Sequence, residues 1–182
     1  MSSMTIEKVP LPEDALLNIY HGADAFTDCY TTRIPFPVSH GDFIVSFYTT
    51  WLFKLERFLI GFLGGYPATD SDAEALASGA ADCFSAWRVE ASTTDQILLS
   101  DLRGRTRSWL MVKHAASSFE RDSFERNSLE TILYFGSAVV LVENSRTGKK
   151  SMGLLFDALS GFHKLYSVLL LKLAAGKLLR GK

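Results

Sequence analysis

The sequence predicts an α+β fold, in which a curved antiparallel β-sheet is followed by one long C-terminal α-helix. Two observations lead to this prediction. Strand-prone segments joined by short turns succeed one another from Asp82 to Val142. An amphipathic helical pattern then runs from Ser151 to the C-terminus. A curved sheet followed by a terminal helix usually leaves a cavity between the two, which narrows the possible activities without naming one.

Length and composition favour a single globular domain. The chain has 182 residues, of which 47% are hydrophobic and 21% are charged, enough for a sizeable core. We expect residues 1–20 to be a lead-in and residues 21–182 to form one domain. The net charge of −1 gives no general attraction to nucleic acid or to an anionic membrane, and the oligomeric state stays open.

Cysteine usage and the two ends of the sequence favour a cytoplasmic protein. The two cysteines, Cys29 and Cys83, are too few for a disulfide framework and fit buried free thiols in a reducing compartment. Residues 1–14 contain no apolar core of signal-peptide length. In the C-terminal segment the longest uncharged stretch, Leu165 to Leu171, is well short of the ~18 residues that cross a bilayer.

The N-terminal half predicts a strand and then a capped helix. Pro10 and Pro12 argue against regular structure before the first strand. Residues 25–34 are strand-prone, and two prolines close the segment behind them. Ser39 and Asp42 then form a capping box, because the serine side chain caps the amide of Asp42.

The capped helix is amphipathic, with a break near Thr49–Thr50. Its apolar face is formed at i, i+4 and i+7 spacing by Ile44, Tyr48, Trp51, Leu55, Leu59 and Phe62. The opposite stripe is formed by Ser46, Thr50, Lys54, Arg57 and Gly61. Gly64–Gly65 ends this helix, and a short helix over residues 70–78 with Gly79 as its stop follows.

The second half supplies the antiparallel strands. Three strands joined by tight turns are expected over residues 83–91, 96–101 and 105–113. Residues 114–128 are polar and unperiodic, which indicates a mobile loop or a frayed helical turn. An apolar strand bent at Gly136 and then a turn lead to the last helix, over residues 129–142 and 144–150.

The turns allow the two faces of the sheet to be separated. A two-residue turn at Arg103–Gly104 pairs Ser100 with Arg107 and Leu98 with Trp109, and the preceding turn places Trp87 beside Ser100. One face then carries Trp87, Val89, Leu98, Trp109 and Met111, with Arg105 and Arg107 toward one end. The other carries Ala86, Arg88, Glu90, Ile97, Leu99, Asp101, Thr106, Ser108, Leu110 and Val112. Because the second set has charges in mid-strand, we expect it to face solvent and the tryptophan-bearing face to meet the helices.

The terminal helix is expected to cover that inner face. Its apolar stripe consists of Leu155, Leu159, Phe162, Tyr166, Leu169 and Leu173. The opposite side carries Asp157, Ser160, Lys164 and Ser167. Beyond Val168 the helix is apolar nearly all round, which indicates burial on more than one side or an exposed apolar end.

The order of strand, two helices, antiparallel strands and long C-terminal helix resembles the helix-grip fold of the START and Bet v 1-like (SRPBCC) ligand-binding superfamily. More narrowly, the chain resembles an uncharacterised bacterial domain family that is sometimes fused to epimerase-like domains. The matching residues are Asp24-Ala25-Phe26, Trp87-Arg88-Val89-Glu90, Gly104 with Trp109-Leu110, and His163 with Tyr166. The resemblance implies a hydrophobic cavity between sheet and helix, and it implies no established activity.

Motifs for catalysis, metal binding or a cofactor are missing from the sequence. The four histidines are scattered, with no H-E-x-x-H pattern and no pair of cysteines at metal-ligand spacing, so we expect no metal. Gly148-Lys149-Lys150 lacks the other residues of a phosphate-binding loop. No G-x-S-x-G elbow is present, and neither cysteine has an activating context. We assign no catalytic residue and no cofactor.

The strongest candidate site is a small-molecule pocket with aromatic walls and an arginine at its mouth, which would suit a carboxylate or phosphate group. Its candidate ligand-binding residues are Trp87, Arg105, Arg107, Trp109, Leu159, Phe162, His163 and Tyr166. The alternative for these residues is ordinary core packing, with arginines that reach water or stack on Trp87. The leading hypothesis is therefore a non-catalytic domain that binds a small apolar or amphipathic molecule.

Two further hypotheses stay open. The first is a cyclase-like or hydratase-like enzyme in the same cavity, with His163 and either Tyr134 or Asp157 as the acid–base pair. The second is a module that contacts a membrane surface or a partner through the basic C-terminal helix, although that helix has a simpler role in closing the domain.

Overall fold

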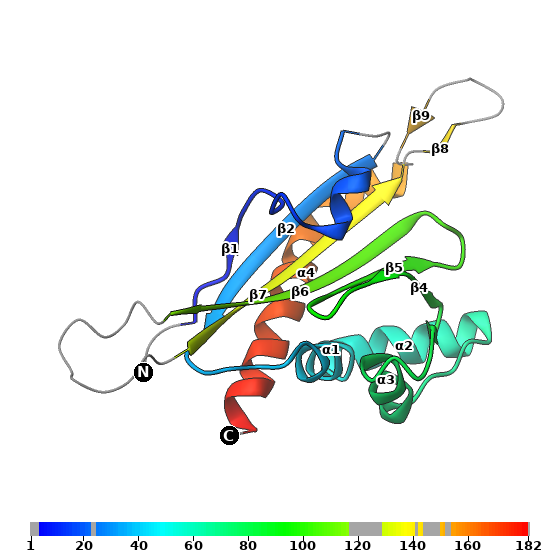
Figure 1. Ribbon diagram of the computed structural model, residues 1–182. Coiled ribbons are helices and arrows are strands. Elements are labelled where there is room, and N and C mark those ends of the chain that lie inside the picture. The colour runs from blue at the N-terminus through cyan, green and yellow to red at the C-terminus, as the bar shows by residue number, and fades with distance from the viewer. Residues whose placement is uncertain are drawn as a thin grey trace, which may run out of the picture.

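The computed structural model describes residues 4–22, 25–116, 129–140, 142–143, 150–151 and 154–181. Within these residues the fold is α+β: one curved antiparallel sheet, a set of helices against it and a long C-terminal helix (Figure 1). The helices are α1 (His40–Tyr48), α2 (Trp51–Gly64), α3 (Asp70–Ala77), α4 (Leu154–Arg180) and the short 3₁₀ helix η1 (Leu16–Tyr20). The predicted fold class is confirmed at this level.

The sheet has seven strands in the order β1-β2-β7-β6-β5-β4-β3, and every neighbouring pair is antiparallel. The strands are β1 (Glu7–Lys8), β2 (Ala25–Ile34), β3 (Cys83–Phe84), β4 (Trp87–Ser92), β5 (Gln96–Asp101), β6 (Thr106–Ala116) and β7 (Leu129–Val140). A separate short pair joins β8 (Val142–Glu143) to β9 (Lys150–Ser151). The expected loop over residues 114–128 begins later than predicted, because β6 continues to Ala116, and its remaining residues lie outside the described ones.

Several predicted boundaries are confirmed because short-range chemistry sets them. Ser39 caps α1 by accepting a hydrogen bond from the Asp42 amide at 3.0 Å. The chain breaks at Thr49–Thr50, where both hydroxyls donate to backbone carbonyls and Thr50 Oγ1 accepts from the Phe53 amide. Gly65 and Gly79 have φ of +74° and +73°, so each ends the preceding helix in a conformation that glycine adopts without strain.

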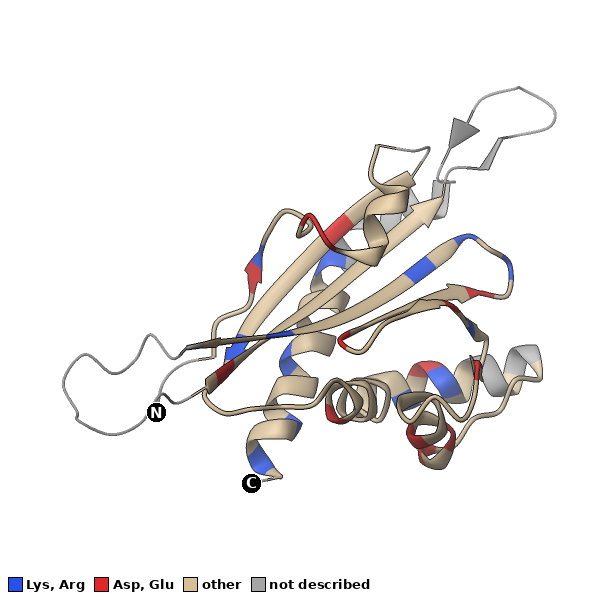
Figure 2. Cartoon of the chain, viewed as in Figure 1, with Lys and Arg blue, Asp and Glu red and all other residues tan. Residues whose placement is uncertain are grey.

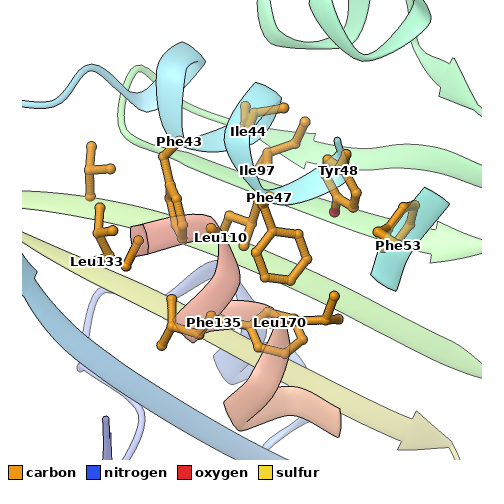
Figure 3. Close-up of a cluster of buried hydrophobic side chains, with 14 of the residues drawn as sticks. Phe43, Ile44, Phe47, Tyr48, Phe53, Ile97, Leu110, Leu133, Phe135 and Leu170 are labelled. Carbon is orange, nitrogen blue, oxygen red and sulfur yellow. The ribbon is translucent and has the colours of Figure 1, made fainter. Parts of the chain in front are cut away.

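The main core lies between the helices and the side of the sheet that faces them, which we call the inner face. Its strand residues include Ile97, Leu99, Leu110, Leu133 and Phe135. These residues cluster with Phe43, Ile44, Phe47 and Tyr48 of α1, Phe53 of α2 and Leu170 of α4, and Figure 3 shows all of them except Leu99 labelled. The face predicted to be solvated is therefore the buried inner face.

The opposite side of the sheet, the outer face, is also covered. Trp109, Leu98 and Met111 are fully buried there, in a second cluster with Ala15 and Leu17 of the N-terminal segment. Figure 1 shows this segment crossing the side of the sheet opposite α4. Residues 7–8 and 16–20 of this segment form β1 and η1, although Pro10 and Pro12 predicted no regular structure before the first strand.

One irregularity explains why the two faces were assigned wrongly. The predicted pairing of β5 with β6 is confirmed: Ser100 lies opposite Arg107 and Leu98 opposite Trp109. Between β4 and β5 the register shifts around Glu90, so that Val89 pairs with Leu99 and Ala91 with Leu98. Trp87 and Val89 consequently pack against the inner core, on the face opposite Trp109. A β-bulge of this kind moves side chains to the other face.

Helix α2 presents its predicted apolar stripe to solvent. Trp51, Leu55, Leu59 and Phe62 are 61%, 50%, 47% and 78% exposed, whereas Arg57 of the predicted polar stripe is 8% exposed. Arg57 donates to the Thr69 carbonyl at 3.0 Å and to Asp70 at 2.8 Å, and it lies over the Phe84 ring. Figure 2 shows acidic and basic residues close together on α2 and acidic residues on α3. The Arg57–Asp70 ion pair joins α2 to α3, and Phe53 and Glu56 lie on the side of α2 that faces the cavity.

Helix α4 is rotated relative to the prediction. The side chains it buries are Ser167, Leu170, Leu171, Ala174 and Ala175, whereas Leu169 and Leu173 are half-buried. Ser167 was expected on the polar side, yet it is fully buried. Because the helix is apolar nearly all round beyond residue 168, its periodicity does not determine which side packs on the sheet. None of the helices in the described residues is long and apolar enough to cross a membrane.

Candidate functional site

A cavity of about 190 Å³ lies between the inner face of the sheet and the helices α1, α2 and α4. Residues of β4, β6 and β7 line it on the sheet side, and residues of the three helices line the other side. Its wall is formed by Phe47, Phe53, Glu56, Trp87, Thr106, Arg107, Ser108, Phe135, Ser137, Ala138, Val139, Tyr166, Ser167 and Leu170. The cavity is thus in the position predicted for a ligand site, between the sheet and the C-terminal helix.

One side of the cavity is aromatic and apolar. The rings of Phe47 and Phe135 have centroids 4.7 Å apart, and those of Phe47 and Phe53 are 6.4 Å apart. Leu170 of α4 lies close to the Phe135 ring (Figure 3). These side chains pack against one another and form an apolar surface for part of a ligand.

The polar side of the cavity contains an acid hydrogen-bonded to a phenol. The Tyr166 hydroxyl donates to the Glu56 carboxylate, which joins α4 to α2. Burial raises the pKa of Glu56 although this hydrogen bond opposes the shift. Burial also raises the pKa of Tyr166, and the nearby charge of Glu56 raises it further. The proton therefore stays on the phenol, and Glu56 is a carboxyl group whose charged form is disfavoured.

Two buried polar atoms of residues in the cavity wall have no hydrogen-bond partner in the part of the chain that the structure describes. They are Oγ of Ser167, a residue that is fully buried, and Nε1 of Trp87. The other serines of the wall are bound: Ser108 exchanges a hydrogen bond of 3.0 Å with Tyr48, and Ser137 donates to Asp28 at 2.6 Å. Buried polar atoms without partners are rare in folded proteins, so each of these two atoms is available for a hydrogen bond to a bound molecule.

The structure brings together some of the candidate residues. Trp87, Arg107 and Tyr166 belong to the cavity wall. The Arg107 guanidinium, however, is bound at the outer face by Glu90 at 2.6 Å and by the Tyr20 hydroxyl at 2.8 Å, over the Tyr20 ring. The charge of Arg107 is therefore already neutralised. The sequence analysis suggested that this arginine binds a carboxylate or phosphate of the ligand, but its guanidinium is occupied by Glu90 and Tyr20.

The remaining candidate ligand-binding residues either lie away from the cavity or have side chains outside the described residues. Arg105 is exposed in the turn between β5 and β6. Trp109 is fully buried on the outer face, where its Nε1 donates to Gln96 at 2.9 Å. The side chains of Leu159, Phe162 and His163 lie outside the described residues, although the backbone of all three is in α4.

The acid–base pair of the enzyme hypothesis is not assembled as expected. The Tyr134 ring packs on the outer face, with its centroid 6.4 Å from that of Trp109. The side chains of His163 and Asp157 lie outside the described residues. The acid in the cavity is Glu56 instead.

No model of a known protein family matches this chain, and neither does any curated protein sequence.

Glu56 and Ser167 are the residues that the sequence analysis missed. Ser167 was predicted on the polar side of its helix and Glu56 was assigned to neither stripe, whereas the observed orientations of α2 and α4 bring both into the cavity wall. The one feature of the sequence that distinguishes Glu56 is that it is the only acid between Trp51 and Gly64.

Elsewhere in the described residues, fewer side chains are placed to bind a ligand or to react. The described residues hold no group of three or more His, Cys, Asp or Glu residues placed to bind a metal ion. A second depression of about 350 Å³ lies beside β2 and the N-terminal segment, and Cys29 belongs to its wall. Burial raises the pKa of the Cys29 thiol to about 12, so this cysteine is not a nucleophile at neutral pH.

Proposed function

We propose that this chain is a binding domain of the helix-grip type, which holds a small apolar or amphipathic molecule between the sheet and the C-terminal helix. The resemblance to the START and Bet v 1-like superfamily, and to its uncharacterised bacterial family, supports the architecture. The proposal requires no metal or cofactor.

The observation that supports this function best is the chemical division of the cavity wall. Phe47, Phe53 and Phe135 provide an apolar surface, while Glu56 and Tyr166 form a polar group at another side. Small-molecule sites generally combine a mostly apolar wall with a few polar groups that set the orientation of the ligand. A ligand with an apolar body and one polar end matches this division.

The test is to fill the cavity without changing the surface. Ser167→Met adds a larger side chain at a fully buried wall position, and Leu165→Met changes a residue that is 65% exposed two positions earlier on α4. Native mass spectrometry and solvent extraction of the purified protein would identify a retained small molecule. A panel of lipids and small aromatic compounds, monitored by tryptophan fluorescence, would supply ligands if none is retained.

We expect the wild-type protein and Leu165→Met to retain or bind the same compound, and Ser167→Met to lose it. Near-ultraviolet circular dichroism shows whether the filled variant is folded. If wild-type protein binds nothing in the panel and carries nothing after purification, the proposed function is wrong.

The pair of Glu56 and Tyr166 favours a second candidate function, a cyclase-like or hydratase-like enzyme. Such reactions need a proton donor beside the substrate, and a carboxyl group with a raised pKa in a cavity is suited to that task. Glu56→Gln separates the two functions. An enzyme would lose turnover while still binding its substrate, whereas a binding domain would show no turnover in either form.

A further inference from the structure

We propose that the cavity selects an uncharged molecule with a hydrogen-bond-accepting oxygen, such as a ketone or an ester, over hydrocarbons and over ions of the same shape. This inference rests on the proposed binding function and specifies the class of ligand. Three observations support it. Two hydrogen-bond donors of the cavity wall have no partner in the described residues, the one arginine of the described wall is already paired, and the cavity is small.

The unpartnered atoms determine which hydrogen-bonding group a ligand must have. An indole N–H donates and cannot accept, so Trp87 Nε1 is satisfied only by an acceptor. The Ser167 hydroxyl also donates to an acceptor, and it is fully buried. Leaving such a group unpaired costs about 1–3 kcal/mol, and a carbonyl oxygen with two lone pairs is able to relieve this cost.

The charges of the described wall disfavour an anion. Arg107, its one Lys or Arg, has its guanidinium bound by Glu90 and Tyr20. An anionic ligand would lose its hydration next to the Glu56 carboxyl without gaining a counter-charge.

A cation is disfavoured for a different reason. An ammonium group is able to pair with Glu56, but it has no lone pair and leaves the Trp87 N–H without an acceptor. An uncharged ligand with an oxygen acceptor satisfies the wall without either cost.

The volume limits the size of the ligand. The cavity has a volume of about 190 Å³. Pockets for drug-sized ligands usually start at about 300 Å³. A compound with one ring and a short substituent is therefore the appropriate probe.

The experiment uses four probes of closely similar shape: acetophenone, ethylbenzene, 1-phenylethylamine and benzoate. Their dissociation constants are measured with the full chain by calorimetry or ligand-observed NMR. A ¹⁵N-labelled sample follows the three indole N–H resonances in parallel, since the chain contains three tryptophans. Trp87→Phe assigns the resonance of Trp87, and Trp51→Phe is the matched control at a position that is 61% exposed.

We expect acetophenone to bind about 3- to 10-fold more tightly than ethylbenzene, the range that one neutral hydrogen bond supplies. It should shift the indole resonance of Trp87 and leave those of Trp51 and Trp109 unchanged. Trp87→Phe and Ser167→Ala should each lower the ratio of acetophenone affinity to ethylbenzene affinity. Trp51→Phe should alter neither.

Equal binding of acetophenone and ethylbenzene would overturn this inference and leave the proposed binding function standing. Tighter binding of the amine or of benzoate, or a shift confined to Trp51, would overturn it in the same way. Failure of all four probes to bind would overturn this inference alone, because the proposed function is tested separately by the wider panel and by extraction of the purified protein.

Discussion

Trp109 and Gly136 lie directly opposite each other on β6 and β7, and the indole covers the glycine. A Cβ atom at position 136 would lie 2.9 Å from Cε3 of Trp109 and 2.9 Å from a methyl carbon of Leu17. Leu17 belongs to η1, which covers the outer face at this point. The N-terminal segment thus packs on the sheet through a position where only glycine leaves room.

Gly136→Ala should therefore destabilise the protein. The added methyl group meets buried atoms on two sides, and overpacking of this kind typically costs about 1–3 kcal/mol. Gly176→Ala is the control, because a Cβ there meets only the flexible end of Arg180, at 3.7 Å, and alanine favours the helix by up to about 1 kcal/mol. In urea titration, Gly136→Ala should lower the free energy of unfolding and Gly176→Ala should raise it. Equal stability of the two would contradict the close packing at β7.

The orientation of α2 predicts that two phenylalanine substitutions on this helix change stability by very different amounts. Phe53 is 3% exposed and packs between Phe47, Tyr48 and Phe84, so Phe53→Ala should cost about 3–5 kcal/mol. Phe62 is 78% exposed, so Phe62→Ala should change the free energy of unfolding by less than about 0.5 kcal/mol. The reverse order in chemical denaturation would mean that the amphipathic pattern of the sequence, and not the structure, gives the true orientation.

Glu56 should make stability depend on pH. Its pKa is higher in the folded protein than in the unfolded chain, so between those two values the folded state binds more protons. The free energy of unfolding contributed by this group therefore falls as the pH rises above about 4.3, its ordinary value, until the folded pKa is passed.

Glu56→Gln removes this titration. Relative to the variant, the wild-type protein should become progressively less stable from about pH 4 toward neutral pH, as measured by urea titration at several pH values. Glu74→Gln, at an exposed position on α3, is the control for the loss of a surface acid. A constant difference between wild type and Glu56→Gln across this range would contradict the burial of Glu56.

The two cysteines should differ in reactivity. Cys83 is exposed, whereas Cys29 is 1% exposed and burial raises its pKa to about 12. At neutral pH a thiol reagent such as Ellman's reagent should modify one cysteine in the folded protein and both in denaturant. Cys83→Ser should abolish the reaction of the folded form. Rapid reaction of that variant would show that the outer face around Cys29 opens to solvent.

The sequence by itself determined the elements whose boundaries depend on neighbouring residues. The strand at residues 25–34, the cap at Ser39, the break at Thr49–Thr50 and the pairing of Leu98 with Trp109 were all predictable. Turns, caps and glycine stops act over a few residues, so their chemistry is complete within a short stretch of sequence.

The tertiary structure decided which side of each element is buried. The shift at Glu90 placed Trp87 and Trp109 on opposite faces, and the burial of Phe53 and Arg57 left the predicted apolar stripe of α2 facing solvent. Glu56 and Ser167 enter the cavity for the same reason. A hydrophobic pattern records that a side chain prefers burial, but the surface that buries it is formed by residues far away in the sequence. This chain buries both faces of its sheet, so only the folded arrangement distinguishes the face with the cavity from the face without it.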